Sequence, residues 1–230
     1  MQNDGVLVLI AAWNEAQRVE QVISGLPDGI PILVVDDGSS DGTAEVARAS
    51  GVNVLIHRVN QGKGAALMSG FRWALERGYA AVLTLDADGQ HDPGEANKFL
   101  LAYQHGQGDL IIGRRSFGEM PFPRNYANAI GSWILSRILR TRIYDNQSGY
   151  RLHTRKLIEF LVIRHTGFEF EVDVILQTVQ HGLTIGWVDI RTIYSVNKTS
   201  YFHPLRDTAK FLGVVWQAYR SIRTGKAGRR

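Results

Sequence analysis

Two aspartates and a glutamine lie close enough together in this sequence to bind one divalent cation. They are Asp86, Asp88 and Gln90, in the pentapeptide Asp-Ala-Asp-Gly-Gln that follows an apolar run. Carboxylates two residues apart, at the point where a chain leaves a sheet, can both reach one ion, and oxygen ligands favour Mg²⁺ or Mn²⁺. Such an ion takes its remaining ligands from water or a diphosphate. The pentapeptide therefore predicts half of a metal–diphosphate site.

Basic residues that suit the other half of such a site stand elsewhere in the chain. Lys63 is flanked by Gly62 and Gly64, and Arg114 and Arg115 follow a later apolar run. The glycines on both sides of the lysine favour a contact with phosphate. The competing interpretation is a solvated lysine in a turn.

The elements that must position these residues alternate between short apolar runs and stretches of helical periodicity. The runs are β-branched or continuously apolar, which is typical of strands buried on both faces. They cover Val6–Ala12, Ile30–Val35, Val52–Ile56, Ala80–Leu85 and Leu110–Gly113. The helical stretches between them cover Glu15–Leu26, Thr43–Ser50, Gly64–Arg77 and Gly94–Gln104. Repeated β-α units predict an α/β fold, with a mostly parallel sheet flanked by helices.

Polar residues follow four of the five predicted strands. Open parallel sheets bind ligands beyond the carboxyl ends of their strands, so these side chains are expected to share one edge. Turn formation and helix capping explain single acids well but the whole pattern poorly. The residues are Asn14 and Glu15, Asp36 and Asp37, Asp86 and Asp88, and Arg114 and Arg115.

Three common motifs for nucleotides or metals are missing. No G-x-G-x-x-G follows the first strand, which excludes the usual dinucleotide fingerprint. A Walker A loop is excluded because Lys63 is followed by Gly64 and because His57 stands where its first glycine belongs. The segment from Asp37 resembles the start of an EF-hand loop, but its twelfth position is Arg48, which cannot bind calcium.

The second half of the chain is less regular. Amphipathic helices with nearby arginines are predicted at Ala127–Tyr144 and Asp207–Arg223, and they suit either packing on the sheet or a lipid interface. Further helices are expected at Leu157–Ile163 and Val172–Gln180, and a strand at Ile185–Ile193. Three acids that alternate with apolar residues are interpreted as a structural edge or pocket wall: Glu169, Glu171 and Asp173.

Composition places the chain among single-domain globular proteins. It has 230 residues, 44% hydrophobic and 21% charged, no cysteine, and no apolar run of about 18 residues that would span a bilayer. Disulfides, cysteine-bound metals and thiol nucleophiles are therefore excluded, and a signal peptide is not expected. Residues 206–230 hold seven basic residues and one acid, a net of +6, which leaves −2 for residues 1–205. Such a tail suits an anionic membrane, nucleic acid or simple solubility.

Five motifs in combination resemble family 2 glycosyltransferases of the GT-A fold, and most nearly the dolichyl- or polyprenyl-phosphate sugar synthases. The usual proline and the usual tyrosine or phenylalanine of the first motif are replaced by Ala11 and Trp13. The motifs lie at Ala11–Glu15, Val35–Thr43, Asn60–Ala66, Asp86–Pro93 and Asp145–Arg151.

The resemblance implies an organisation into a nucleotide-sugar half (6–115), an acceptor half (116–205) and a basic amphipathic helix and tail (206–230). Donor contacts are implied for Ala12, Trp13, Glu15, Asp37, Lys63 and Asp86. Bound Mg²⁺ or Mn²⁺ is implied at Asp86, Asp88 and Gln90. Contacts with acceptor or diphosphate are implied for Arg114, Arg124, Asn128, Ser200, His203 and Arg206.

The expected reaction is an inverting transfer of a sugar from a nucleotide diphosphate, of the GDP-mannose or UDP-glucose type, to a polyprenyl phosphate. An acceptor phosphate is already an anion near neutral pH, so no strong base is required. The catalytic roles would then fall to Asp88, Arg114 and Arg206. In the alternative, a hydroxyl acceptor, Asp145 would be the base, although it is equally interpreted as a cap.

Location and partners follow from the same features. A peripheral enzyme on the cytoplasmic membrane face is expected, since two basic amphipathic helices stand beside the acceptor segment. A nucleic-acid-binding module is disfavoured because the acidic strand-end edge would repel phosphate unless it held a metal. The sugar, the nucleotide and the oligomeric state are left open by the sequence.

Overall fold

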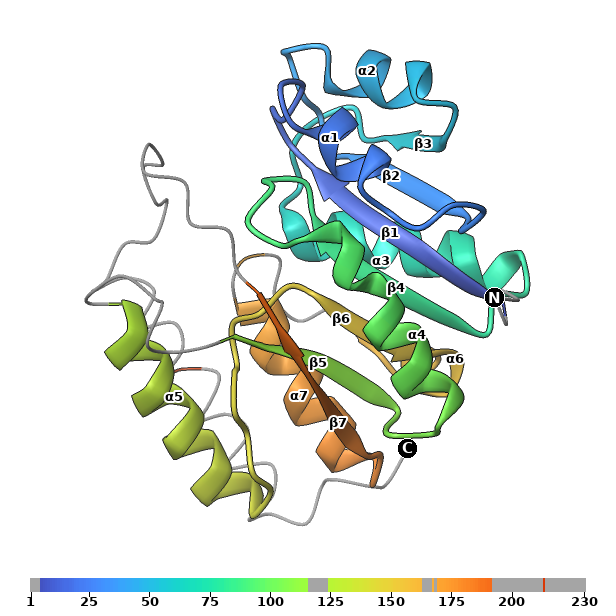
Figure 1. The fold of residues 1–230 in the computed structure, drawn as a ribbon. Coiled ribbons are helices and arrows are strands. Elements are labelled where there is room, and N and C mark those ends of the chain that lie inside the picture. Colours follow the sequence, from blue (N-terminus) through green and yellow to red (C-terminus); the bar gives the residue numbers. More distant parts are fainter. Residues whose placement is uncertain (1–4, 116–123, 163–166, 168, 192–212, 214–230) are drawn as a thin grey trace.

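The computed structural model describes residues 5–115, 124–162, 167, 169–191 and 213. One sheet of seven strands runs through it, in the order β3-β2-β1-β4-β6-β5-β7 (Figure 1). All neighbouring strands are parallel except β6, which is antiparallel to β4 and β5, and this confirms the predicted mostly parallel α/β sheet. The strands are β1 Val6–Ala12, β2 Ile32–Asp36, β3 Asn53–Ile56, β4 Ala81–Asp86, β5 Leu110–Arg115, β6 Arg151–Thr154 and β7 Ile185–Ile190.

Helices cover both faces of the sheet, because the strands are apolar on both sides. In β1, Leu7 and Leu9 pack into one core with α3, α5, α6 and α7, while Val8 and Ile10 pack into a second core with α1, α2 and α4. Successive side chains of a strand point to opposite faces, which is why a continuous apolar run serves both cores. The helices are α1 Val19–Ser24, α2 Thr43–Ala49, α3 Lys63–Glu76, the short 3₁₀ helix η1 Pro93–Glu95, α4 Ala96–Gln104, α5 Arg124–Leu139, α6 Arg155–Ile158 and α7 Glu169–Gln180.

Strand β6 is the main difference from the sequence-based expectation. Its four residues include Arg151 and His153, so the segment lacks the apolar run by which the other strands were recognised. Because β6 is antiparallel to β4, its first residue lies at the carboxyl edge of β4, where Arg151 is opposite Thr84. The loop that leads into β6 therefore reaches the edge that carries Asp86.

Several boundaries also differ. Arg114 and Arg115 belong to β5 and do not follow it, and the first helix begins at Val19 instead of Glu15. Helix α5 ends at Leu139, and the next residue, Arg140, has a positive φ of 51°. The predicted helix at 207–223 lies outside the described residues except for Gly213.

Gly38 brings the loop after β2 against the segment after β3. Its φ is +74°, and a Cβ atom at this position would lie 2.6 Å from the carbonyl carbon of Val59 and 2.7 Å from the nitrogen of Asn60. Both neighbours are backbone atoms, so a side chain has no flexible group to displace. Only glycine combines this backbone conformation with so close an approach.

We expect Gly38→Ala to lower the free energy of unfolding by about 3 kcal/mol, because strain at positive φ adds to a backbone overlap. Urea unfolding followed by circular dichroism measures the loss. The matched control is Gly29→Ala, where φ is +75° and nothing lies within 4 Å of the added carbon. The control is expected to lose only about 1 kcal/mol. Equal losses in the two variants would show that the close approach to Val59 adds nothing to the loss of stability.

Candidate active site

The loop after β1 is held by the loop after β2. The Asn14 amide donates to the Ser39 hydroxyl at 2.8 Å, and the Ser40 amide donates to the Asn14 side-chain oxygen at 2.9 Å. Asn14 has a φ of 54°, a conformation that asparagine tolerates better than most residues. Beside it, Trp13 leaves 48% of its surface exposed at the carboxyl edge of the sheet. The loop therefore presents an indole ring on which a planar base can stack.

Asp37 is buried and fully engaged by the protein. Its carboxylate accepts hydrogen bonds from the amides of Gln61, at 3.0 Å, and Gly62, at 2.7 Å, and contacts His57 Nδ1 at 2.7 Å. These bonds fix the segment that leads into α3, whose first residue is Lys63. The described contacts of Asp37 thus support the segment before Lys63. Ala12 is the last residue of β1, and Glu15 follows it in the next loop.

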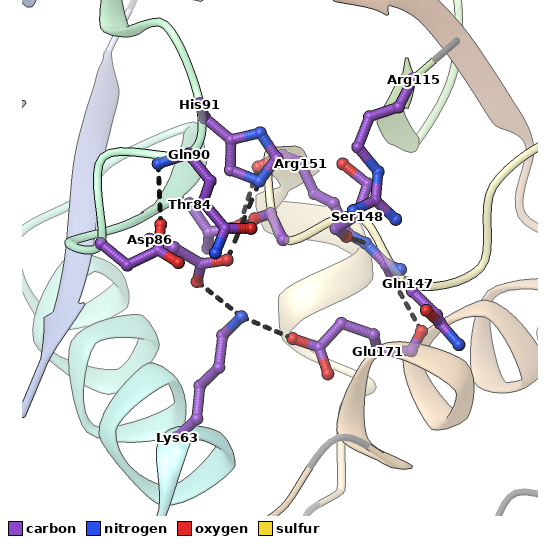
Figure 2. A network of polar contacts seen from close by, with 12 residues as sticks. Lys63, Thr84, Asp86, Gln90, His91, Arg115, Gln147, Ser148, Arg151 and Glu171 are labelled. Carbon is purple, nitrogen blue, oxygen red and sulfur yellow. Dashed lines mark hydrogen bonds and ion pairs between the residues drawn. The ribbon is translucent and has the colours of Figure 1, made fainter. Parts of the chain in front are cut away.

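Lys63 connects two carboxylates from distant parts of the chain (Figure 2). Its ammonium lies 2.5 Å from Asp86 Oδ1, at the end of β4, and 2.7 Å from Glu171 Oε1, on α7. Burial alone would lower the pKa of Lys63, but Asp86 and then Glu171 outweigh it and raise the pKa above its usual value. The lysine therefore stays charged, and the sequence-based interpretation as a solvated turn residue is wrong.

The same contacts act on the groups around Asp86. Burial would raise the pKa of Asp86, but the Lys63 charge outweighs it and lowers the pKa. His91 Nε2 lies 3.8 Å from Asp86 Oδ2, and burial lowers the pKa of His91 to about 4. His91 is therefore neutral at physiological pH.

The oxygen atoms at the end of β4 fit a hard divalent cation. Asp86 and Asp88 are partly exposed, and Asp88 Oδ1 accepts a hydrogen bond from the Gln90 amide at 2.9 Å. Within the described residues, no group of three or more histidines, aspartates or glutamates is arranged to hold a metal by itself. Two carboxylates are enough when a diphosphate supplies further oxygens, which is the usual situation for Mg²⁺.

Asp145, in the loop before β6, lies in a buried ion pair. Arg115 donates two hydrogen bonds to it, at 2.7 and 2.9 Å, and Asn128 donates a third at 3.0 Å. Burial alone would raise the pKa of Asp145, but the Arg115 charge outweighs it and lowers the pKa to about 2. Asp145 also accepts from the amides of Gln147 and Ser148, as the sequence-based alternative of a cap predicts. This geometry disfavours a role as general base, which needs an accessible carboxylate with a pKa closer to neutrality.

Arg151 organises the loop that reaches Asp86. It donates to the carbonyl oxygens of Ser148, Asn146 and Glu171, at 2.6 to 3.0 Å, and is fully buried. Burial lowers the pKa of Arg151 to about 10, so it remains charged at neutral pH. A Cβ atom on Gly149 of this loop would lie 2.8 Å from Lys63 Nζ and closer still to Asp86. Any larger residue here would displace the charged ends of Lys63 and Asp86.

Arg114 faces a different environment from Arg115. It forms a two-bond ion pair with Asp189 on β7, at 2.5 and 2.8 Å, and its guanidinium lies 4.7 Å from the centre of the Tyr144 ring. The described contacts of Arg114 therefore lie toward β7 and not toward Lys63. Sequence reasoning put both Arg114 and Arg115 at this edge but assigned a contact only to Arg114. It assigned no site contact to Arg151 or Glu171, although these stand in a recognised motif and in the alternating acidic segment.

Four other predicted residues cannot be placed in the site. Arg124 is the first residue of α5, but its side chain lies outside the description. Ser200, His203 and Arg206 fall in 192–212, outside the described residues. Their roles stay predictions.

The Arg115–Asp145 pair yields a stability prediction. We expect Asp145→Asn to lower the free energy of unfolding at pH 7 by about 3 kcal/mol, because it leaves Arg115 buried without a counter-charge. The wild-type carboxylate stabilises the fold above pH 3.8 and loses that effect as pH falls toward 2, so the difference between the proteins should shrink between pH 4 and 2. Urea unfolding at pH 7, 4, 3 and 2 tests this, with Glu159→Gln, in an exposed pair, as control. A difference that is constant with pH would contradict it.

Comparisons with known proteins extend these observations. The family model described as Glycosyl transferase family 2 matches residues 7–167. The chain is 34% identical over 201 residues to an undecaprenyl-phosphate mannosyltransferase of Micrococcus luteus, a match that covers 80% of this chain and 82% of that protein. It is 32% identical over 201 residues to a polyprenol monophosphomannose synthase of Mycolicibacterium smegmatis, with 80% and 76% covered.

A solved structure has a similar fold. Glucosyl-3-phosphoglycerate synthase from Mycobacterium tuberculosis, in complex with Mn²⁺, uridine diphosphate and glucosyl-3-phosphoglycerate, matches with a TM-score of 0.72 at 22% identity, covering 94% of this chain and 78% of that one. This likeness confirms the GT-A architecture predicted from the sequence. The family match includes Lys63, Asp86, Asp88 and Asp145 and extends over more than half of the chain. The chain belongs to glycosyl transferase family 2.

Proposed function

We propose that this protein is an inverting glycosyltransferase that moves a hexose from a nucleotide diphosphate sugar to a polyprenyl phosphate. The observation that carries the proposal is the pair of strand-end carboxylates, Asp86 and Asp88, with Lys63 held against the first of them. The similarity to two enzymes named for polyprenyl-phosphate mannose transfer supports the acceptor class and favours GDP-mannose as donor. A relative from Methanococcus voltae is 26% identical and is named for transfer of N-acetylglucosamine from UDP-N-acetylglucosamine to dolichyl phosphate. A UDP-sugar is therefore the alternative donor.

The donor would lie along the carboxyl edge of the sheet. The exposed Trp13 ring can stack on the base, because aromatic rings stack on any nucleobase. Ala12 and Glu15 border the same position, and Asp37 contributes by fixing the segment before Lys63. The diphosphate would then reach the end of β4, next to Asp86 and Asp88.

Asp86, Asp88 and Gln90 would hold Mg²⁺ or Mn²⁺ on the diphosphate, and the bound ion would supply charge neutralisation for the leaving group. Asp86 enters this role already ionised, because Lys63 lowers its pKa. The acidic edge thus changes from repelling to attracting a diphosphate when a cation is bound. Arg114, Arg124, Ser200, His203 and Arg206 are proposed to contact the acceptor phosphate or the diphosphate.

An anionic acceptor agrees with the state of Asp145. A polyprenyl phosphate carries its own negative charge and needs no base, and Asp145 is held in an ion pair with a pKa of about 2. We therefore assign Asp145 and Asn128 to positioning the loop before β6. The alternative, a hydroxyl acceptor with Asp145 as base, is less favoured on the same observation.

Helix α5 supports a peripheral contact with an anionic membrane. Ile130 and Trp133 are 58% and 66% exposed, one turn apart, and the exposed Arg137 follows on the next turn. Apolar side chains beside arginines suit a lipid interface, where basic residues meet anionic headgroups. In the described part of the chain, no helix is long and apolar enough to cross a bilayer. We propose that α5 lies on the cytoplasmic membrane surface that carries the acceptor.

A transfer assay tests the reaction. Labelled GDP-mannose, UDP-glucose and UDP-N-acetylglucosamine are offered separately, with Mn²⁺ and detergent-solubilised polyprenyl phosphate, and label is counted in the organic phase. We expect label from one donor and at least a 100-fold loss in Asp88→Asn, because the variant lacks a carboxylate that would hold the cation that neutralises the leaving group. The exposed Asp28→Asn is the control. Label found only in free sugar released by donor hydrolysis, or on added sugars, would contradict a lipid phosphate as acceptor.

Vesicle sedimentation tests the membrane contact. We expect the wild type to sediment with phosphatidylglycerol vesicles and the double variant Ile130→Ser, Trp133→Ser to bind at least about tenfold more weakly, because two apolar side chains no longer enter the interface. Val59→Ser, which removes an exposed apolar side chain near β3, is the control. Equal binding of the wild type and the double variant would contradict a role for α5.

A further inference from the structure

Lys63, Asp86 and Glu171 form one charged cluster, in which the lysine contacts both carboxylates. The proposed reaction gives no role to Glu171. It lies on α7, in the acceptor half, whereas Lys63 and Asp86 belong to the donor half. Its carboxylate is buried, with 6% of its side chain exposed, while Lys63 and Asp86 keep 28% and 27%. Glu171 therefore meets Lys63 from the interior, and Asp86 meets it from the more open side.

The cluster has one positive charge for two negative charges. Glu171 Oε1 contacts the ammonium at 2.7 Å, and Glu171 Oε2 is buried without a hydrogen-bond partner among the described residues. Figure 2 shows the ammonium between the two carboxylates. An unpaired buried carboxylate oxygen is costly, so its presence beside a cation calls for an explanation. Oε2 offers the Lys63 ammonium a second acceptor atom on Glu171.

Binding of a divalent cation at Asp86 would change the balance of charge. Lys63 and the ion would then compete for one carboxylate, and like charges a few ångströms apart repel strongly at the effective dielectric of a partly buried site. The conflict is relieved if the ammonium keeps a full counter-charge elsewhere. Glu171 supplies that charge at hydrogen-bond distance.

We propose that Glu171 is a positioning residue for metal binding, which retains the Lys63 ammonium when a divalent cation takes Asp86. Lys63 then changes from a bridge between two carboxylates to a pair with Glu171. The inference rests on the proposed metal-dependent function and adds a residue that the family resemblance did not single out. It also makes cation binding on the donor side depend on the packing of α7, in the acceptor half.

Mn²⁺ binding measures this directly, without turnover. MnCl₂ is titrated into the full chain, alone and with GDP or UDP, and free Mn²⁺ is followed by electron paramagnetic resonance. We expect Glu171→Gln to weaken Mn²⁺ binding about tenfold, since Lys63 then has only Asp86 as partner. We expect Lys63→Met to tighten binding, and Glu171→Gln added to Lys63→Met to change it less than twofold.

The double variant separates this inference from two other roles. If Glu171→Gln weakens binding equally with and without Lys63, Glu171 attracts the ion directly and the inference is wrong. If Glu171→Gln lowers stability but leaves Mn²⁺ affinity unchanged, the pair only clamps α7 to α3, and the inference is again wrong. Glu171→Asp, which keeps the charge, is expected to retain most of the affinity and covers the case in which Glu171→Gln does not fold.

Glu159→Gln is the matched control for Glu171→Gln. Glu159→Gln removes one negative charge from an exposed pair with Arg155 and is expected to leave the Mn²⁺ affinity unchanged. If the wild type itself binds no Mn²⁺, with or without nucleotide, the proposed metal-dependent function fails. Wild-type binding that Glu171→Gln does not alter contradicts only the role of Glu171.

Discussion

A charge buried without a partner costs several kcal/mol, and this constraint decides how the second half of the chain lies on the first. Lys63, at the start of α3, meets Glu171 of α7, and Arg115, at the end of β5, meets Asp145 of the loop before β6. Each pair joins elements that are far apart in the sequence. The pairs have a definite geometry, which apolar packing alone does not impose, and so they fix α7 and the loop before β6 relative to the sheet.

The reversed direction of β6 is what makes those pairs possible. Every parallel strand of the sheet ends at the carboxyl edge, but β6 begins there, so the loop before it passes directly over Asp86. Gly149 allows the backbone to approach the charged pair, and Arg151 holds the loop by its carbonyl oxygens. Asp37 performs the corresponding task from the other side, since it fixes the segment before Lys63.

The sequence predicted β1, β2, β4 and β5 well because they are buried almost throughout, and their continuous apolar runs can be recognised from local composition. It missed β6, whose four residues are stabilised by neighbours on both sides and not by their own apolar character. It also placed Arg114 and Arg115 together at the site but assigned a contact to Arg114 alone. Adjacent residues of a strand point to opposite faces, so the choice depends on the register with β7 and β6, which no local pattern contains. Glu171 was interpreted as part of a structural edge or pocket wall. Its partner could not be identified because Lys63 is more than 100 residues away in the sequence.

The balance of charge at the carboxyl edge bears on the chemistry. Among the described residues, three cations near the predicted site are paired with carboxylates: Lys63 with Asp86 and Glu171, Arg115 with Asp145, and Arg114 with Asp189. A fourth, Arg151, is buried and donates to three backbone carbonyl oxygens. A transfer between a diphosphate and a phosphate gathers several negative charges in one place. These paired side chains offer little net positive charge to offset them. The balance therefore favours a reaction in which a divalent cation at Asp86 and Asp88, together with basic residues beyond β7 such as Arg206, supplies the missing charge.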